Sequence, residues 1–201
     1  MAVKETNSET NETAKSKLPV YICPGFHESV LTERFVRSLP SFTQPHIFTA
    51  FPADPIAVFR WLTQHWLSQQ KYSPIAPITA IGFSAGVVGM AGALTLWQQQ
   101  GKKVARFFAV DGWGMPIAGL PTCRLSHDEF THWSSLPLGA GKVNFYADPA
   151  VEHLALWENP ERALGWQVND WEGGRSKGIA TTASIFLNAQ LQIEWQKMSV
   201  L

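Results

Sequence analysis

The segment Gly82-Phe83-Ser84-Ala85-Gly86 holds the residues whose types and spacing most directly suggest chemistry. A Gly-x-Ser-x-Gly segment between a strand and a helix forms a sharp turn that strains the serine backbone and exposes its hydroxyl. An apolar run at 75–81 precedes the segment, and a helical pattern follows it up to Gly101. Ser84 is therefore expected to be a nucleophile at a helix N-terminus, whose amides favour a developing negative charge. The alternative is a glycine-rich turn without a nucleophile.

A serine hydroxyl becomes a nucleophile when a nearby base removes its proton, and histidine is the usual base. Three histidines lie downstream of Ser84, namely His127, His132 and His153. We expect His153 to be the base, because it closely follows Asp148 and would lie over the same strand ends. His132 and His127 stay as alternatives, as does a purely structural role for all three.

An acid normally orients that histidine, and two aspartates come directly after predicted strands. Asp111 stands in the segment AVDGWG, and Asp148 stands in YADPAVEH. Either carboxylate is a candidate for the acid. Because aspartate before glycine or proline is common in turns, each also has a purely structural interpretation.

Short apolar runs alternate with helical patterns along the chain, which predicts an α/β fold: a mostly parallel sheet between two layers of helices. The ligand site of such a sheet lies at the carboxyl ends of its strands. Pro24-Gly25, Ser84, Asp111 and Asp148 each follow a predicted strand and should meet at that edge. Strands are expected at 18–23, 46–51, 75–81, 104–110 and 142–146, and helices at 31–39, from 54, at 87–100 and at 178–197.

These motifs resemble the α/β-hydrolase superfamily, over most of residues 18–150. The segment VYICPGFHES is similar to that family's first core strand and the loop that supplies an oxyanion-hole amide, with Pro24-Gly25 where the family usually has His-Gly. The resemblance implies that the backbone N–H groups of Phe26 and Ala85 hold the oxyanion, with His27 lining the pocket. It also implies a serine hydrolase that cleaves an ester or thioester. The two cysteines and the polar N-terminal segment separately lead us to expect a cytoplasmic protein. The family order is serine, acid, histidine, and its usual acid resembles Asp148, whereas some lipases use the position of Asp111.

The resemblance departs at the histidine that the family usually carries, as Gly-His, before its last helix. The corresponding stretch here is DWEGGRSKG, which contains Arg175, and no histidine follows His153. A guanidinium cannot act as a base at neutral pH. The main alternative function is therefore an inactive α/β-hydrolase-like binding or scaffold protein, and a further one is an acyltransferase whose acceptor is an alcohol.

Five tryptophans follow Asp111, mostly in loop-like sequence after predicted strand ends, and favour an apolar or acyl-bearing small-molecule substrate. We expect Trp113 and His132 to line the pocket. The alternative is that the rings close a compact core or a homodimer contact. The five are Trp113, Trp133, Trp157, Trp166 and Trp171.

Composition narrows the functional classes. The formal net charge is zero and no run of Lys or Arg marks a phosphate-binding face, so nucleic acid is not an expected partner. Cys23 and Cys123 have no metal-ligand spacing and are expected to be reduced thiols. His127 and His132 flank Asp128, but a metal site needs three or four ligands, and we expect neither a metal nor another cofactor.

The first residues of the sequence are polar and carry almost nothing to bury. We expect residues 1–17 to be a disordered tail and residues 18–201 to form a single domain. The tail has no apolar stretch typical of a signal peptide, and no apolar run approaches the roughly 20 residues of a membrane span.

Overall fold

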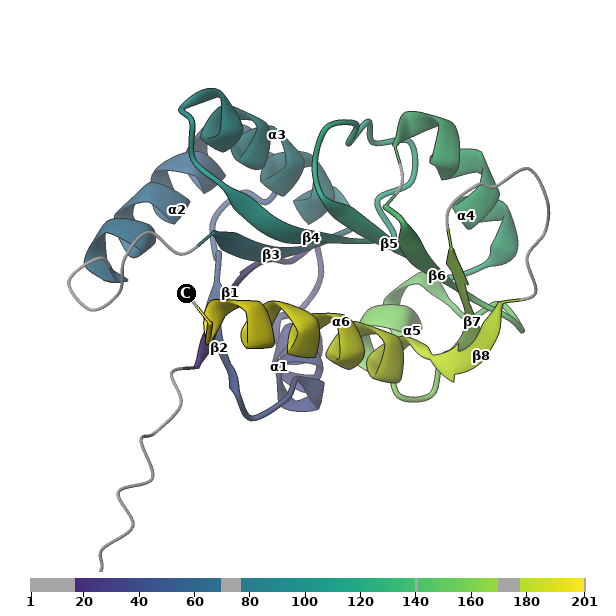
Figure 1. Ribbon diagram of the computed structural model, residues 1–201. Coiled ribbons are helices and arrows are strands. Elements are labelled where there is room, and N and C mark those ends of the chain that lie inside the picture. Colours follow the sequence, from purple (N-terminus) through teal and green to yellow (C-terminus); the bar gives the residue numbers. More distant parts are fainter. Residues whose placement is uncertain (1–16, 70–76, 140, 170–177, 201) are drawn as a thin grey trace, which may run out of the picture.

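An eight-stranded sheet forms the centre of the molecule (Figure 1). The computed structural model of the chain describes residues 17–69, 77–139, 141–169 and 178–200. In spatial order the strands are β2 (Thr43–Ile47), β1 (Leu18–Cys23), β3 (Ile78–Phe83), β4 (Val104–Val110), β5 (Thr122–Ser126), β6 (Val143–Ala147), β7 (Leu164–Asn169) and β8 (Ile179–Thr182).

The described strands pair in parallel from β2 to β6, and the pairs β6–β7 and β7–β8 are antiparallel, so that β7 runs opposite to the other strands. Parallel strands need crossovers, and helices supply most of them here. This arrangement confirms the expected α/β fold class, a mostly parallel sheet flanked by helices. It also brings the carboxyl ends of β1, β3, β4 and β5 to one edge, side by side.

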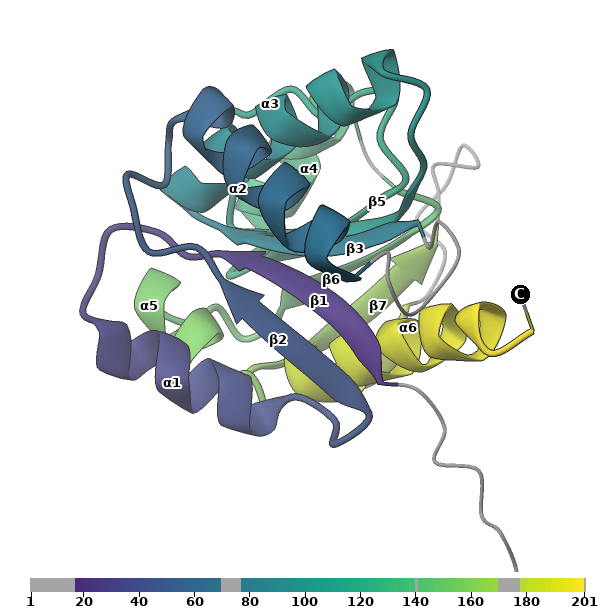
Figure 2. The ribbon, with the colours of Figure 1, turned by 90° about the vertical axis from the view of Figure 1, so that its left-hand side faces the viewer.

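Helices cover both faces of the sheet (Figure 2). The helices α2, α3 and α4 lie on one face, and α1, α5 and α6 lie on the other (Figures 1 and 2). Their bounds are α1 (Ser29–Ser38), α2 (Pro55–Gln69), α3 (Ala85–Gln99), α4 (Glu129–Ser135), α5 (His153–Glu158) and α6 (Ala183–Met198).

The central strands are buried on both faces, as parallel strands between helices must be. All six residues of β3 are buried. Ile78 and Ala80 pack in the cluster beneath α2 and α3, whereas Ile81 and Phe83 pack in the cluster beneath α1 and α6. The strand that carries the serine is therefore held from both sides, and its end is a rigid platform.

The strand β5 was not predicted, because its sequence, TCRLS, contains an arginine. The Arg124 side chain is buried in this strand, yet its guanidinium donates to three carbonyl oxygens, of Gly139 (2.6 Å), Met115 (2.9 Å) and Gly112 (3.4 Å). These bonds replace water and make burial of the charge tolerable. Burial also lowers the pKa of Arg124 to about 10.

Several other predicted elements have different bounds, and the second strand and the last helix differ most. The second strand lies at Thr43–Ile47 rather than at 46–51. The last helix begins at Ala183 rather than at 178, because residues Ile179–Thr182 pair with β7 as β8. Thr182 then caps the helix, its hydroxyl accepting from the Ile185 N–H at 3.2 Å.

Two predictions lie outside the described residues, namely the tail at 1–16 and the segment around Arg175. Within the described part of the chain, no helix is both long and apolar enough to cross a membrane. Cys23 and Cys123 are both buried and unpaired, as expected.

Candidate active site

Ser84 occupies a strained turn between β3 and α3. Its backbone angles are φ 51° and ψ −122°, in the region that L-residues rarely adopt. A side chain at Gly86 would place a Cβ 2.0 Å from the Cys23 carbonyl oxygen, so only glycine fits where α3 approaches the end of β1. This geometry confirms the sharp strand-to-helix turn that the sequence predicts at Ser84.

Asp111 lies at the next strand end and is also strained. It follows β4 with φ 53°, and Ser84 and Asp111 are the two non-glycine residues with positive φ among those described. The Ser84 N–H donates to the Val110 carbonyl at 2.9 Å, which ties the two strand ends together. Because strain of this kind persists where function requires it, the pair marks the candidate site.

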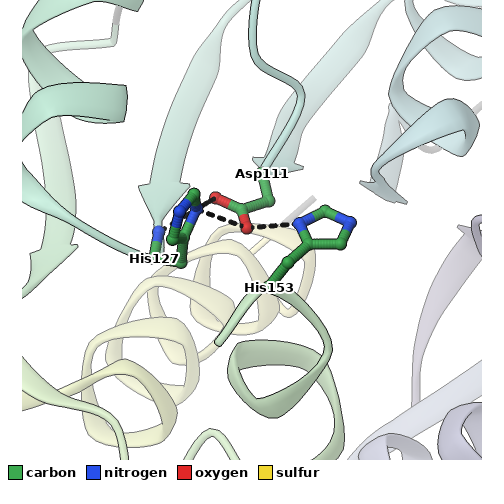
Figure 3. A group of neighbouring side chains, drawn as sticks. All are labelled: Asp111, His127 and His153. Atoms are coloured by element: carbon green, nitrogen blue, oxygen red, sulfur yellow. Dashed lines mark hydrogen bonds and ion pairs between the residues drawn. The ribbon is translucent and has the colours of Figure 1, made fainter. Parts of the chain in front are cut away.

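His153 joins the two strand ends. Its Nδ1 lies 2.6 Å from Asp111 Oδ2 (Figure 3), and its ring stacks on Phe83, the neighbour of Ser84, with centroids 4.7 Å apart. An ionised carboxylate only accepts hydrogen bonds, so Nδ1 is the donor, and in a neutral ring Nε2 would be the acceptor. His153 thus has the tautomer that a general base needs, beside the strained serine.

A ladder of stacked rings fixes the orientation of the His153 imidazole. Phe35 stacks on Trp157 at 3.6 Å, and Trp157 stacks on Phe83 at 4.8 Å, with interplanar angles of 12° and 13°. The ring of Phe83 in turn stacks on the ring of His153. Trp157 is fully buried, so its role is in the core rather than in a substrate pocket.

His127 contacts Asp111 from the opposite side (Figure 3). Its Nδ1 lies 2.9 Å from Oδ1 and 2.8 Å from Oδ2, and its backbone N–H donates to Oδ1 at 2.9 Å. Its Nε2 lies 3.5 Å from Asp128 Oδ2. One buried carboxylate therefore holds two imidazoles.

The electrostatics of the site follow from this arrangement. Burial raises the pKa of Asp111, but hydrogen bonds from His127 and His153 outweigh it and the net pKa is lowered. The hydrogen bond to Asp111, and then the charges of Asp111, Asp128 and Glu152, raise the pKa of His127 despite partial burial. Asp111 is therefore a carboxylate at neutral pH, and His127 takes up a proton more readily than an ordinary histidine.

Asp148 has a different neighbour. Its Oδ2 accepts a hydrogen bond from Trp166 Nε1, on β7, at 2.9 Å. The carboxylate that faces His153 is instead that of Asp111. The proximity of Asp148 and His153 in sequence thus does not translate into pairing of their side chains.

His132 belongs to α4 and points into the interior of the protein. Its side chain is buried, in ring contact with Trp133 and stacked on Tyr146. Burial, and secondarily the charge of Arg124, lowers its pKa to about 4. A histidine in this environment stays neutral and packs as an aromatic ring.

The β1–α1 loop lies against the serine. A Cβ at Gly25 would come within 2.9 Å of the Ser84 Cβ, so the loop backbone passes directly beside that side chain. Among the turn, loop and cap hydrogen bonds of the described residues, neither the Phe26 nor the Ala85 N–H is a donor. Both amides are free to bind a ligand, as an oxyanion hole requires.

His27 lies on the same loop and contacts Phe83. Its Nε2 is 2.9 Å from Thr32 Oγ1, and its ring contacts Phe83 edge-on at 5.4 Å. Burial, and then the charge of His153, lowers its pKa. Trp113 lies beyond β4, exposed, with its Nε1 donating to Ser134 Oγ at 3.1 Å.

Asp111, His127 and His153 also form a potential metal-ligand set. One ligand atom of each lies within 4.8 Å of the others, and carboxylate with imidazole suits zinc. The short Nδ1–carboxylate distances of 2.6–2.9 Å are those of hydrogen bonds, in which a proton occupies the place a metal would take. Of the two histidines around Asp128 in sequence, this set contains His127 and not His132.

The chain has distant counterparts among solved structures. No protein-family model and no curated protein matches its sequence. The NocB thioesterase domain, solved as a covalent complex with a fluorophosphonate nocardicin G analogue, is 13% identical, with a TM-score of 0.48 over 73% of this chain and 89% of that one. Aspergillus fumigatus lipase B is 15% identical, with a TM-score of 0.39 over 56% of this chain and 38% of the lipase.

The nonribosomal peptide synthetase AB3403, a four-domain protein bound to AMP and glycine, is 16% identical, with a TM-score of 0.38. The match covers 48% of this chain and 8% of the synthetase, so this chain spans a small part of that protein's length. At these identities and scores the likeness concerns the general course of the chain and not its chemistry.

Proposed function

We propose that this protein is a serine hydrolase that cleaves an ester or thioester through an acyl-enzyme on Ser84. One observation carries the proposal: the Asp111–His153 hydrogen bond lies beside the strained serine turn. The proposed triad is Ser84, His153 and Asp111, and its order along the chain is serine, acid, histidine.

In the proposed mechanism, His153 Nε2 removes the Ser84 hydroxyl proton as Oγ attacks the carbonyl carbon. The backbone amides of Phe26 and Ala85 stabilise the oxyanion that forms. Asp111 stabilises the imidazolium, which returns the proton to the departing alcohol or thiol. Water, activated by the same histidine, then attacks the acyl-enzyme and releases the acid and free Ser84.

An apolar rim supports an acyl-bearing substrate. Four aromatic side chains of the described residues are between 61% and 72% exposed, and all four follow carboxyl strand ends on the edge that carries Ser84. Exposed aromatic rings gathered around one site are typical of apolar ligand binding. They are Phe26, Phe51, Trp113 and Phe130, of which the first two are in ring contact at 5.1 Å.

The alternative of an inactive binding protein rests on the absence of Gly-His before the last helix. Against it we propose His153, on the helix after β6, as the histidine of the triad, a role supported by its hydrogen bond to Asp111. Strained backbone at both Ser84 and Asp111 is typical of an active site rather than of a scaffold, and this favours the hydrolase.

We expect purified protein to hydrolyse p-nitrophenyl esters, with kcat/KM rising at least about tenfold from acetate to octanoate because apolar pockets reward added methylenes. Trp113→Ala should reduce turnover of octanoate more than that of acetate. The measurement is a chain-length series with acyl thioesters included, with and without EDTA. No turnover of any substrate would contradict the hydrolase, and loss of turnover in EDTA would point to a metal at Asp111, His127 and His153 instead.

The two aspartates form a matched pair for testing the acid. Asp111→Asn should lower kcat by roughly 10³–10⁴-fold, because the His153 tautomer and imidazolium lose their partner. Asparagine tolerates the positive φ at this position, so the fold should persist. Asp148→Asn should change kcat only a few-fold. The reverse order of effects in an ester assay would assign the acid to Asp148.

A further inference from the structure

The two imidazoles that contact Asp111 lie on different sides of it, as the strand order requires. Ser84 follows β3, Asp111 follows β4 and His127 follows β5, and these three strands are neighbours in the sheet. Asp111 therefore lies between the serine and His127. His153 reaches over from α5 on the serine side, against Phe83, while His127 lies on the β5 side (Figure 3).

His127 makes more contacts with the Asp111 carboxylate than His153 does. Its Nδ1 bridges both oxygens and its backbone N–H adds a third contact, whereas His153 makes one bond, to Oδ2. The Asp111 side chain is only 1% exposed, so each donor matters for keeping it ionised. While His127 is neutral, it is a donor that fixes the position of the acid.

The far nitrogen of His127 can take up a second proton. Nε2 lies 3.5 Å from Asp128 Oδ2, and the His127 side chain is 28% exposed, so protons can reach it from solvent. The charged groups that face His127 are Asp111 after β4, Asp128 before α4, and Glu152 and His153 at the start of α5. Three of these four are acidic, which favours the cation.

We propose that His127 is a positioning residue of the active site that supports Asp111 when neutral and attenuates the triad when it takes up a proton. This inference rests on the proposed hydrolase function. A cationic His127 partly cancels the charge of Asp111. It therefore weakens the stabilisation of the imidazolium that must form on His153 in the transition state.

The sign of the pH effect follows directly. The pKa of His127 is raised above the ordinary value of 6.5, so His127 becomes charged before an ordinary histidine does as the pH falls. The acid side of the kcat/KM profile should contain an additional partial loss that begins above pH 6.5. For charges a few ångströms apart in a partly exposed site, the loss should be about tenfold.

The direct test compares wild type with His127→Asn, whose side-chain amide can donate to Asp111 but cannot be protonated. In buffers with EDTA, wild type should lose activity in two steps as the pH falls from 9 to 5, and the variant in one step. The ratio of kcat/KM at pH 8.5 to that at pH 6 should be about tenfold smaller in the variant. Superimposable profiles would overturn the proposal.

Asp128→Asn is a matched control, because the asparagine side chain can still accept the Thr131 N–H that caps α4. Loss of the negative charge beside Nε2 should move the additional step to lower pH and leave turnover at pH 8.5 unchanged. A step that stays at the same pH would assign it to a group other than His127.

An NMR titration of the His127 and His153 ring resonances gives a readout without turnover. In wild type the His153 resonances should shift in two steps, and in His127→Asn in one. If the protein hydrolyses no ester but shows this coupling, the proposed function fails and the electrostatic link stands. If His153 titrates identically in both proteins, the inference about His127 is wrong whatever the activity.

Discussion

Ser84→Ala should lower kcat/KM for ester hydrolysis by about 10⁵-fold or more, because the variant lacks the hydroxyl on which the proposed acyl-enzyme forms. Loss of one hydroxyl leaves the turn and its glycines unchanged, so the melting temperature should change little. Steady-state rates with a p-nitrophenyl ester measure the effect. Ser68→Ala, on the exposed part of α2, is the control and should retain full activity.

A different result would have a clear meaning. Turnover of Ser84→Ala within about tenfold of wild type would place the chemistry on another group. A large fall in melting temperature would mean that the hydroxyl also contributes to the fold.

His153→Ala should reduce ester turnover by about the same factor, because a serine without its base is a poor nucleophile and triad members act as a unit. A second measurement is chemical rescue. The His153 side chain is 41% exposed, so its removal leaves a space that is open to solvent. Added imidazole should therefore restore part of the activity of His153→Ala. The measurement is the rate of ester hydrolysis against imidazole concentration.

His65→Ala is the control for that variant, because His65 lies on α2 and hydrogen-bonds the Trp61 carbonyl of its own helix. It should retain activity and show no response to imidazole. Full activity of His153→Ala would transfer the role of base to His127, the other imidazole on Asp111.

The serine turn and the parallel sheet were predictable from the sequence because both depend on local signals. Gly82 and Gly86 flank Ser84 in a spacing that only a tight strand-to-helix turn requires, and an apolar run precedes them. The structure bears out this turn, with φ 51° at Ser84. The strand at 104–110 was equally clear, since it is a continuous apolar run that ends at Asp111.

The pairing of side chains across the site was not predictable to the same degree. Both aspartates follow strands, and only the strand order shows that Asp111 lies next to the serine. The unpredicted strand β5 hid the place of His127, because a buried arginine interrupts its apolar pattern. A count of polar groups at strand ends would have found His127 once β5 was recognised, since it directly follows that strand.

The role of the tryptophans also depends on tertiary structure. Trp157 is buried in a ring stack beneath the site, and Trp113 is exposed beside it, although both follow strands in the sequence. Trp171 lies outside the described residues. Sequence alone does not separate a ring in the core from a ring at a pocket, because both are apolar segments near turns.

Covalent labelling tests most directly whether Ser84 is an activated nucleophile. A fluorophosphonate probe phosphonylates a serine whose base is in place, with loss of fluoride, and leaves an ordinary hydroxyl unmodified. Intact-mass analysis should show one adduct per wild-type chain, mapped to Ser84 by peptide sequencing. Ser84→Ala should give none, and His153→Ala should react far more slowly. A wild-type protein that is folded and remains unlabelled, or an adduct on a residue other than Ser84, would contradict the proposed hydrolase.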